Sequence, residues 1–164
     1  MDRTETPGPV DRLKRIDEFT LADLEAVLAR TEGGLRAAFT HVQNEFNLLV
    51  TRDRNDVILR AKAEGLRYAA FSPLAGGLLT GKYQEGRRAG PGTRVSDAPD
   101  YYAHLLVPST FEAIEGLRRR AAEWGWTVSG AALRFILDTE GVDSLVIAPR
   151  SSEQFGDYGL VWRP

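Results

Sequence analysis

The sequence predicts an α/β fold in which parallel strands are joined by helical crossovers. Three short apolar runs, at residues 37–46, 66–71 and 145–148, alternate with stretches whose apolar residues recur at helical spacing. Such alternation indicates βαβ units and a parallel sheet, whose ligand sites lie at the carboxyl ends of the strands. We expect residues 1–12 to form a disordered leader and residues 13–164 one domain. A complete (β/α)8 barrel takes about 250 residues, so these 164 do not suffice for one.

Composition excludes several classes of function. The chain has 21 Lys+Arg against 23 Asp+Glu, a net charge of −2, so it lacks the basic excess of nucleic-acid binders. It contains no cysteine and two histidines, His41 and His104, which argues against disulfides and against a metal site. No apolar run approaches the ~18 residues of a membrane span, and the acidic N-terminus is unlike a signal peptide. We therefore expect a cytoplasmic protein with neither a nucleic-acid nor a membrane partner.

The elements before the second apolar run follow from local patterns. Thr20 and Asp23 have the spacing of a capping box, which predicts a helix that continues to the glycine pair at 33–34. The strand over 37–46 comes next. A second helix follows Asp53 and ends at Gly65. Its inward residues are Val57, Ile58 and Ala61.

The later elements are predicted in the same way. The apolar run at 66–71 has the pattern of a strand buried on both faces. A long, poorly ordered loop leads to Pro108, and Ser109-x-x-Glu112 then predicts the start of a helix. Its inward residues are Phe111, Ile114, Leu117, Ala121 and Trp124. Another helix over 129–137 and the strand over 145–148 follow, and a final helix is capped by Ser151-x-x-Gln154.

The loop after the second strand has part of a phosphate-binding motif. Gly76 to Lys82 fits the spacing G-x-x-x-x-G-K. A nucleotide hydrolase is rejected, because Tyr83 stands where a magnesium-binding hydroxyl is needed and no helical pattern follows. Two interpretations remain: a surface loop punctuated by glycines, or a backbone that closes over a flat anionic ligand.

Other polar groups at strand ends also have two readings. Arg150, Ser151 and Ser152 begin a helix, where free N–H groups and a guanidinium suit a phosphate, although a capping box with a solvated arginine gives the same pattern. Together with the glycine loop they favour one extended, multiply phosphorylated ligand. The polar cluster at 43–45 either faces a site, finds internal partners or meets solvent at a strand end. Tyr101 and Tyr102 suit either a lid or an anchoring contact, and the arginines at 118–120 are interpreted as solvated surface.

Three segments together resemble the second half of an aldo-keto reductase. They are Gln43-Asn44-Glu45-Phe46-Asn47-Leu48-Leu49, the stretch from Phe71 to Tyr83, and Arg150-Ser151-Ser152-Glu153-Gln154. The resemblance covers roughly Asp17 to Phe155 and is strongest to the branch of the aflatoxin-aldehyde reductases and shaker-type channel β-subunits. It implies a partial (β/α)8 TIM barrel, about its second half, and an oxidoreductase that reduces carbonyl compounds with NADP(H).

The resemblance also implies roles for individual residues. Gln43 is expected to contact the nicotinamide carboxamide, and Phe71 to stack on the nicotinamide ring. The expected cofactor contacts in the glycine loop are Ser72, Pro73, Leu74, Gly76, Leu78, Gly81 and Lys82. The expected contacts at the 2′-phosphoadenosine end are Arg150, Ser151 and Gln154. The cofactor and substrate mouth is expected to be lined by Arg94, Tyr101 and Tyr102, with the two tyrosines on the substrate side.

The departures from the family pattern concern catalysis. The family's catalytic Asp, Tyr, Lys and His lie in the first half of its barrel, which has no counterpart in this chain, so no catalytic residue is predicted. The Ser-Asn pair that holds the carboxamide falls at Asp17-Glu18, and the Asn of the adenine motif falls at Tyr158. We expect weak or lost NADP(H) binding and no turnover by the chain alone. A partner chain that supplies the missing half, or self-association, is one expectation; a non-catalytic NADP-binding remnant or structural module is the other.

Overall fold

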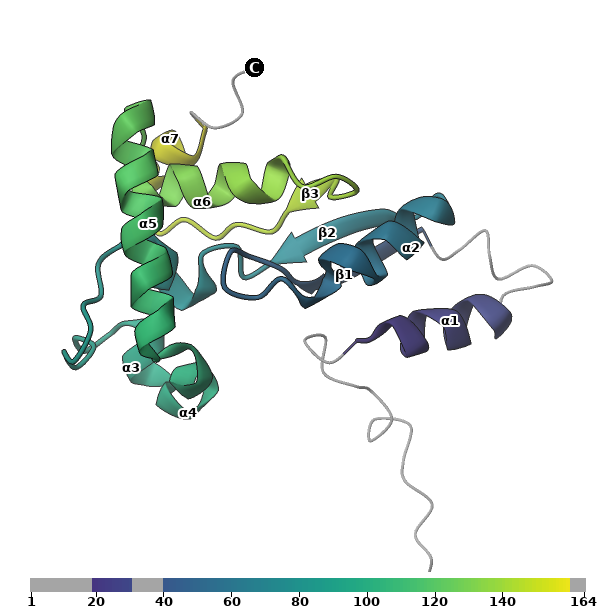
Figure 1. Cartoon of the computed structure of the whole chain (residues 1–164), viewed down its shortest axis with the longest axis horizontal. Helices are drawn as coiled ribbons and strands as arrows, with labels where there is room; N and C mark the ends of the chain where they lie inside the picture. The colour runs from purple at the N-terminus through teal and green to yellow at the C-terminus, as the bar shows by residue number, and fades with distance from the viewer. Residues whose placement is uncertain (1–18, 31–39, 160–164) are drawn as a thin grey trace, which may run out of the picture.

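A computed structural model describes residues 19–30 and 40–159 of the chain (Figure 1). The expected leader, the glycine pair at 33–34 and the start of the first predicted strand lie outside these residues. The α-helices are α1 (Leu21–Arg30), α2 (Val57–Ala63), α3 (Arg94–Asp97), α4 (Pro99–Tyr102), α5 (Pro108–Trp124), α6 (Val128–Leu137) and α7 (Ser152–Gly159). The strands are β1 (His41–Glu45), β2 (Arg67–Phe71) and β3 (Ser144–Leu145), and 3-10 turns cover Arg52–Asn55, Ala75–Thr80 and Ala103–Leu105.

The three strands form a parallel sheet in the order β1-β2-β3, as the alternation of strands and helices predicted. Gln43 pairs with Ala69, which pairs with Ser144 on its other side. The prediction that the second strand is buried on both faces is wrong. Tyr68 and Ala70 are fully buried, but Phe71 is only half-buried. The reason is that α1, α2 and α6 pack against one face of the sheet, where Tyr68 and Ala70 point.

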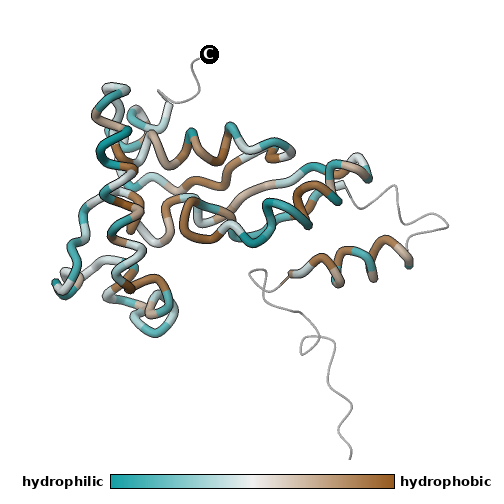
Figure 2. The backbone as a smooth tube through the Cα atoms, in the orientation of Figure 1, coloured by the Kyte–Doolittle hydropathy of each residue, from teal (hydrophilic) through white to brown (hydrophobic). Residues whose placement is uncertain are grey.

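A first hydrophobic cluster lies between the sheet and these helices. Its fully buried members include Phe46 of the segment after β1, Tyr68 of β2, Ile58 of α2 and Ile136 of α6. Val57, Ile58 and Ala61 face inward on α2, as predicted. Figure 2 shows the resulting alternation of hydrophobic and hydrophilic turns along α1 and α6. No helix in the described residues combines the length and the apolar character needed to cross a bilayer.

A second cluster orders the segment between Lys82 and Pro108, where a poorly ordered loop was predicted. That prediction is wrong, because three apolar side chains of the segment, Val95, Tyr102 and Leu105, are buried against the glycine loop, α5 and α6. Local caps add to this packing. The Thr93 hydroxyl accepts a hydrogen bond from the Ser96 N–H at the start of α3, and Pro99 opens α4.

Helix starts were predicted with mixed success. The capping box at Thr20 is confirmed, with Asp23 N–H donating to the Thr20 hydroxyl and Thr20 N–H donating to the Asp23 carboxylate. The box at Ser109 is wrong: α5 begins at Pro108 without a side-chain cap, since proline already has a helical φ. Trp124 is also not inward. It is 53% exposed and packs edge-on against Trp126, with ring centroids 5.6 Å apart.

A buried polar cluster joins β1, β2 and the 3-10 turn at Arg52–Asn55, which precedes α2. Asp53, 2% exposed, accepts hydrogen bonds at one carboxylate oxygen from the Asn44 amide (2.5 Å) and the Tyr68 hydroxyl (2.8 Å). The Asn44 amide also donates to the Phe19 carbonyl at 2.8 Å. Burial raises the pKa of the Asp53 carboxyl and that of the Tyr68 hydroxyl above their ordinary values. The cluster thus connects three segments that are distant in sequence.

Replacing Asp53 with Asn should remove a pH-dependent part of the free energy of unfolding. Both donors use the same carboxylate oxygen, so an amide oxygen can accept both hydrogen bonds. Since the pKa of Asp53 is raised on folding, its contribution to stability is fully present below the unfolded pKa and is lost as pH rises through the folded one. Wild type should therefore lose stability relative to Asp53→Asn as the pH is raised above the ordinary carboxyl pKa of about 4. Urea unfolding at a series of pH values measures the difference.

The matched control for that measurement is Asp100→Asn, because Asp100 is exposed on α4. This substitution removes a carboxylate from an exposed position, so it controls for the change in net charge alone. If the difference in free energy of unfolding between wild type and Asp53→Asn does not change with pH, the Asp53 carboxyl does not have the raised pKa that its burial implies.

Gly76 is the tightest backbone position of the glycine loop. Its φ is +65°, and a Cβ placed there would lie 2.4 Å from a ring carbon of Tyr102. Gly86 has a similar φ of +70° but nothing within 4 Å of the same position. The two glycines therefore separate backbone strain from steric exclusion.

Gly86→Ala should cost about 1–2 kcal/mol of stability, the penalty of a left-handed residue that carries a Cβ. Gly76→Ala should cost about 1–3 kcal/mol more, because Tyr102 must move out of a packed cluster. Urea unfolding at one pH compares the two variants. Equal losses of stability in the two variants would show that Tyr102 does not pack against Gly76.

Candidate functional site

The carboxyl ends of β1 and β2 place two of the predicted site residues on one face of the sheet. Gln43 pairs with Ala69, and Glu45 pairs with Phe71. Since side chains alternate along a strand, Gln43 and Phe71 point to the same side, away from α1, α2 and α6. Gln43 is exposed and Phe71 half-buried. An amide and an aromatic ring thus lie together on the open face, where a flat ligand has access to both.

The chain turns sharply after Phe71 and forms a strained loop. Ser72 and Ala75 have φ of +54° and +47°, values that are rare for residues other than glycine. Gly76, Gly77 and Gly81 also have positive φ. The side chains of Pro73 and Leu78 are buried, so these residues offer a ligand mainly their backbone.

Lys82 ends this loop and folds back over it. Its ammonium lies 5.0 Å from the centroid of the Tyr83 ring and within about 3 Å of where a Cβ on Gly77 would stand. The Arg118 guanidinium, from α5, donates to the Gly81 carbonyl at 3.0 Å. Within the described ranges Lys82 makes no ion pair, so its charge is available to an anion near the glycine backbone. No helix begins directly after Lys82; the next one, α3, starts at Arg94. This agrees with the rejection of a nucleotide-hydrolase loop.

The third contributor is the start of α7. Gln154 N–H donates to the Ser151 hydroxyl at 3.2 Å, and Arg150 N–H donates to the Gln154 side-chain oxygen at 2.8 Å. The predicted Ser151 cap is thereby confirmed. The exposed Arg150 guanidinium reaches the Gly92 carbonyl (3.4 Å), two residues before Arg94 opens α3. This contact brings two arginine-bearing segments together across 58 positions of sequence.

Tyr101 and Tyr102 lie side by side in α4, with ring centroids 4.9 Å apart. Tyr102 is only 6% exposed and rests against Gly76, so it anchors the glycine loop. Tyr101 is half-buried beside it. Of the two readings of this pair, an anchoring contact describes Tyr102, and the substrate role of both tyrosines stays a prediction.

Sequence reasoning missed the buried amides that hold these loops in place. Asn47 is fully buried and donates to the Ser72 carbonyl at 3.0 Å, while its side-chain oxygen accepts from the N–H groups of Leu49 and Val50. Asn44 holds β1 through its side-chain N–H groups alone, which donate to the Asp53 carboxylate and the Phe19 carbonyl. The available signal was the polar cluster directly after an apolar run. Its internal-partner reading holds for Asn44. Gln43 is exposed on the other face of the strand, and its contact with a ligand stays a prediction.

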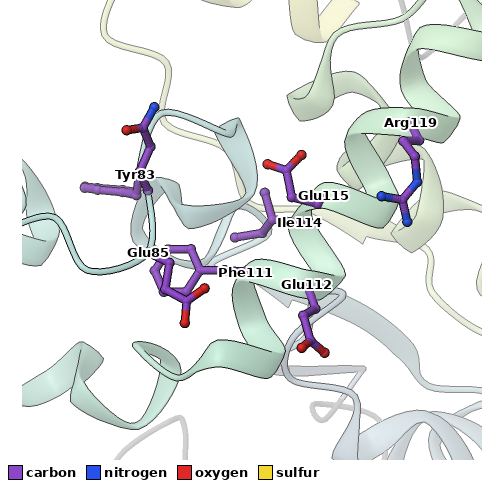
Figure 3. Close-up of a pocket in the computed structure, with 8 residues that line it drawn as sticks. Tyr83, Glu85, Phe111, Glu112, Ile114, Glu115 and Arg119 are labelled. Carbon is purple, nitrogen blue, oxygen red and sulfur yellow. The ribbon is translucent and has the colours of Figure 1, made fainter.

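A cavity next to the glycine loop is not part of this site. It has a volume of about 500 Å³ and begins at Tyr83, beyond Lys82 (Figure 3). Three glutamates against one arginine make it unsuited to a polyanion. Its lining residues are Tyr83, Gln84, Glu85, Phe111, Glu112, Ile114, Glu115 and Arg119. Among the described residues, no group of His, Asp and Glu side chains is arranged to hold a metal ion.

The sequence was compared with protein families and with known proteins. Residues 16–158 match the aldo/keto reductase family. An aldo-keto reductase of Pseudocercospora fijiensis (strain CIRAD86) is 34% identical over 103 residues, which cover 55% of this chain and 33% of that protein. The uncharacterized oxidoreductase YrpG of Bacillus subtilis (strain 168) is 30% identical over 115 residues, 70% of this chain and 33% of that protein. The chain therefore matches about a third of the length of these curated relatives.

The structural comparison agrees on the fold. The glycerol dehydrogenase AKR11B4 from Gluconobacter oxydans aligns with a TM-score of 0.60 and 24% identity, over 75% of this chain and 37% of that one. This likeness and the family match imply a (β/α)8 fold, and the family generally uses NADP(H). The parallel strands and helices described above are consistent with part of such a barrel. On the match over residues 16–158, this chain belongs to the aldo/keto reductase family.

Proposed function

We propose that this chain carries the cofactor-holding second half of an NADP(H)-dependent aldo-keto reductase, whose reaction is carbonyl reduction by hydride transfer. One observation carries the proposal. The ends of all three strands meet at one edge of the sheet, and the Arg150 contact with the Gly92 carbonyl draws the last strand-to-helix loop toward the long segment after β2. A ligand with a flat ring at one end and phosphates along its length matches that arrangement.

The described residues fit NADP(H) in charge and in shape. Phe71 offers a ring face for the nicotinamide, and Gln43 offers an amide on the same side of the sheet. The positive-φ glycines allow a backbone without side chains to approach the pyrophosphate, with Lys82 as the cation. Arg150, Ser151 and Gln154 would hold the 2′-phosphate end, because a guanidinium binds phosphate through paired donors. The bound cofactor would supply the hydride that the reaction requires.

We also propose that the chain alone does not turn over a carbonyl substrate. General acid catalysis needs a donor held within hydrogen-bond reach of the carbonyl oxygen. Near Gln43 and Phe71, the described open face offers the exposed His41 and Arg67 and the buried Glu45, which do not make up the family's set of Asp, Tyr, Lys and His. The alternative is a non-catalytic module that has retained the nucleotide site. Both proposals expect the isolated chain to bind the cofactor without turnover.

The open face of the sheet favours a partner that completes the barrel. β1 and β3 are the outer strands of the described sheet, so each presents one unpaired edge. His41, Gln43 and Arg67 on the open face are exposed, and Val146 just after β3 is 46% exposed. Further strands, from another chain or from a second copy, would cover this face.

NADPH should bind the isolated chain in the millimolar range. Three or four contacts expected from the family are missing, and hydrogen bonds contribute about 1 kcal/mol when neutral and 1.5–3 when charged. A loss of about 4–6 kcal/mol turns micromolar affinity into millimolar or weaker. Arg150→Ala should abolish the remaining binding and any preference for NADPH over NADH. Calorimetric titration with both cofactors measures this, beside an aldehyde-reduction assay.

The matched control is Arg88→Ala, which removes the same charge from an exposed position of the segment after the loop. It should leave the titration unchanged within about twofold. Micromolar NADPH binding by the lone chain, or measurable aldehyde reduction, would overturn the incomplete-site proposal. Equal weakening by both variants would show that Arg150 acts through net charge alone.

Light scattering after size exclusion should find species larger than the 18.1 kDa chain. Val146→Lys should reduce their share, because it puts a charge beside the exposed edge of β3. Leu59→Lys is the control, since Leu59 is 45% exposed but lies on α2 away from that edge. A stable monomer of the wild-type chain at high concentration speaks against the partner proposal.

A further inference from the structure

A second cavity lies on the helix-covered side of the sheet, opposite the open face that carries Gln43 and Phe71. It has a volume of about 680 Å³ and runs between α5, α6 and the segment that connects β1 to α2. Small-molecule sites commonly have volumes of about 300–1,000 Å³. We call it the α5/α6 groove. Its lining residues are Leu48, Arg54, Ala113, Gly116, Leu117, Arg119, Arg120, Glu123, Trp124, Ala131, Arg134, Phe135, Asp138 and Thr139.

The charges of the α5/α6 groove favour an anion. It contains four arginines and two acidic residues. Arg134 is neutralised by Asp138, at 2.7 Å. Arg54, Arg119 and Arg120 form no ion pair with an acid of the described ranges, and Glu123 is the other acidic residue of the lining. Arg119 also borders the first cavity, so of these three cations Arg54 and Arg120 are the two that line this groove alone. The arginines at 118–120 are all exposed, as predicted; Arg118 also donates to the Gly81 carbonyl, and Arg119 and Arg120 line this groove.

The floor of the α5/α6 groove is apolar and held by the core. Phe135 stacks on the fully buried Phe46, with centroids 6.2 Å apart and planes at 14°. The Arg54 guanidinium lies 5.6 Å above the Phe135 ring, so cation and ring share one wall. Trp124, half of its surface exposed, adds a second aromatic wall. Arginine and aromatic side chains side by side are typical of places where proteins bind.

We propose that the α5/α6 groove binds an organic carboxylate with an apolar body, such as a medium-length alkyl chain. The carboxylate would pair with Arg120 and Arg119, since a guanidinium donates hydrogen bonds to both oxygens of a carboxylate. The body would lie on Trp124 and against the edge of Phe135, whose ring faces are occupied by Phe46 and Arg54. The site is separate from the proposed cofactor site, because Gln43 and Phe71 point from the other face of the sheet. It therefore does not depend on NADP(H) binding.

The test is a calorimetric titration of the full chain with decanoate, in the presence and absence of NADP⁺. Wild type should bind decanoate saturably and should bind decan-1-ol at least tenfold more weakly, because the alcohol has no charge for the arginines. Arg120→Gln should weaken decanoate binding about tenfold, the loss of one charged hydrogen-bond pair. Arg118→Gln is the matched control, since it removes the same charge from the neighbouring position and leaves the groove lining intact.

A second variant fills the groove without disturbing the core. A Cβ on Gly116 would meet only the end of the Arg119 side chain, at 4.0 Å, so Gly116→Leu has space and also improves the helix propensity of α5. It should abolish decanoate binding while unfolding at the same or higher urea concentration. Equal binding of decanol, equal loss in Arg118→Gln, unchanged binding in Gly116→Leu, or displacement of decanoate by NADP⁺ would each overturn the proposal.

Discussion

The side chain of Asn47 joins the loop after β1 to the turn after β2, where the glycine loop of the proposed cofactor site begins. From full burial it donates to the Ser72 carbonyl at 3.0 Å and accepts from the N–H groups of Leu49 and Val50. An unpaired amide at this depth would cost about 1–3 kcal/mol, so the loop after β1 and the turn after β2 are constrained to one relative position. Asn44 adds a second buried link, in which its side-chain N–H groups donate to the Asp53 carboxylate and the Phe19 carbonyl.

The strained backbone after β2 is a consequence of that constraint. Ser72 keeps a φ of +54° while its carbonyl is held by the Asn47 amide and by Ala75 N–H. Tyr102 then covers Gly76 from the other side. Strain of this kind persists only where the surroundings over-determine the conformation, and it is concentrated at functional sites. The side chains of the glycine loop therefore pack inward, while its backbone stays accessible. This arrangement suits a long anionic ligand.

Local patterns in the sequence predicted what local physics decides. The parallel sheet and the caps at Thr20 and Ser151 follow from alternation and from hydrogen bonds within four residues. The start of α5 was misplaced because Pro108 and Ser109 are both acceptable at a helix start, and the choice depends on packing.

Long-range contacts decided the rest. The order of the segment from Lys82 to Pro108 depends on Tyr102 and Leu105 reaching a cluster with α5 and α6. The roles of Asn44 and Asn47 depend on partners 9 and 25 positions away. The family resemblance named the cofactor residues but not these amides. Hydrogen–deuterium exchange with millimolar NADP⁺ is the most direct test of the central claim, that one ligand spans the glycine loop and the start of α7. Slower exchange in residues 72–82 and 150–154 together, with α1 unchanged, is the expected result; protection of only one segment, or of neither, would contradict it.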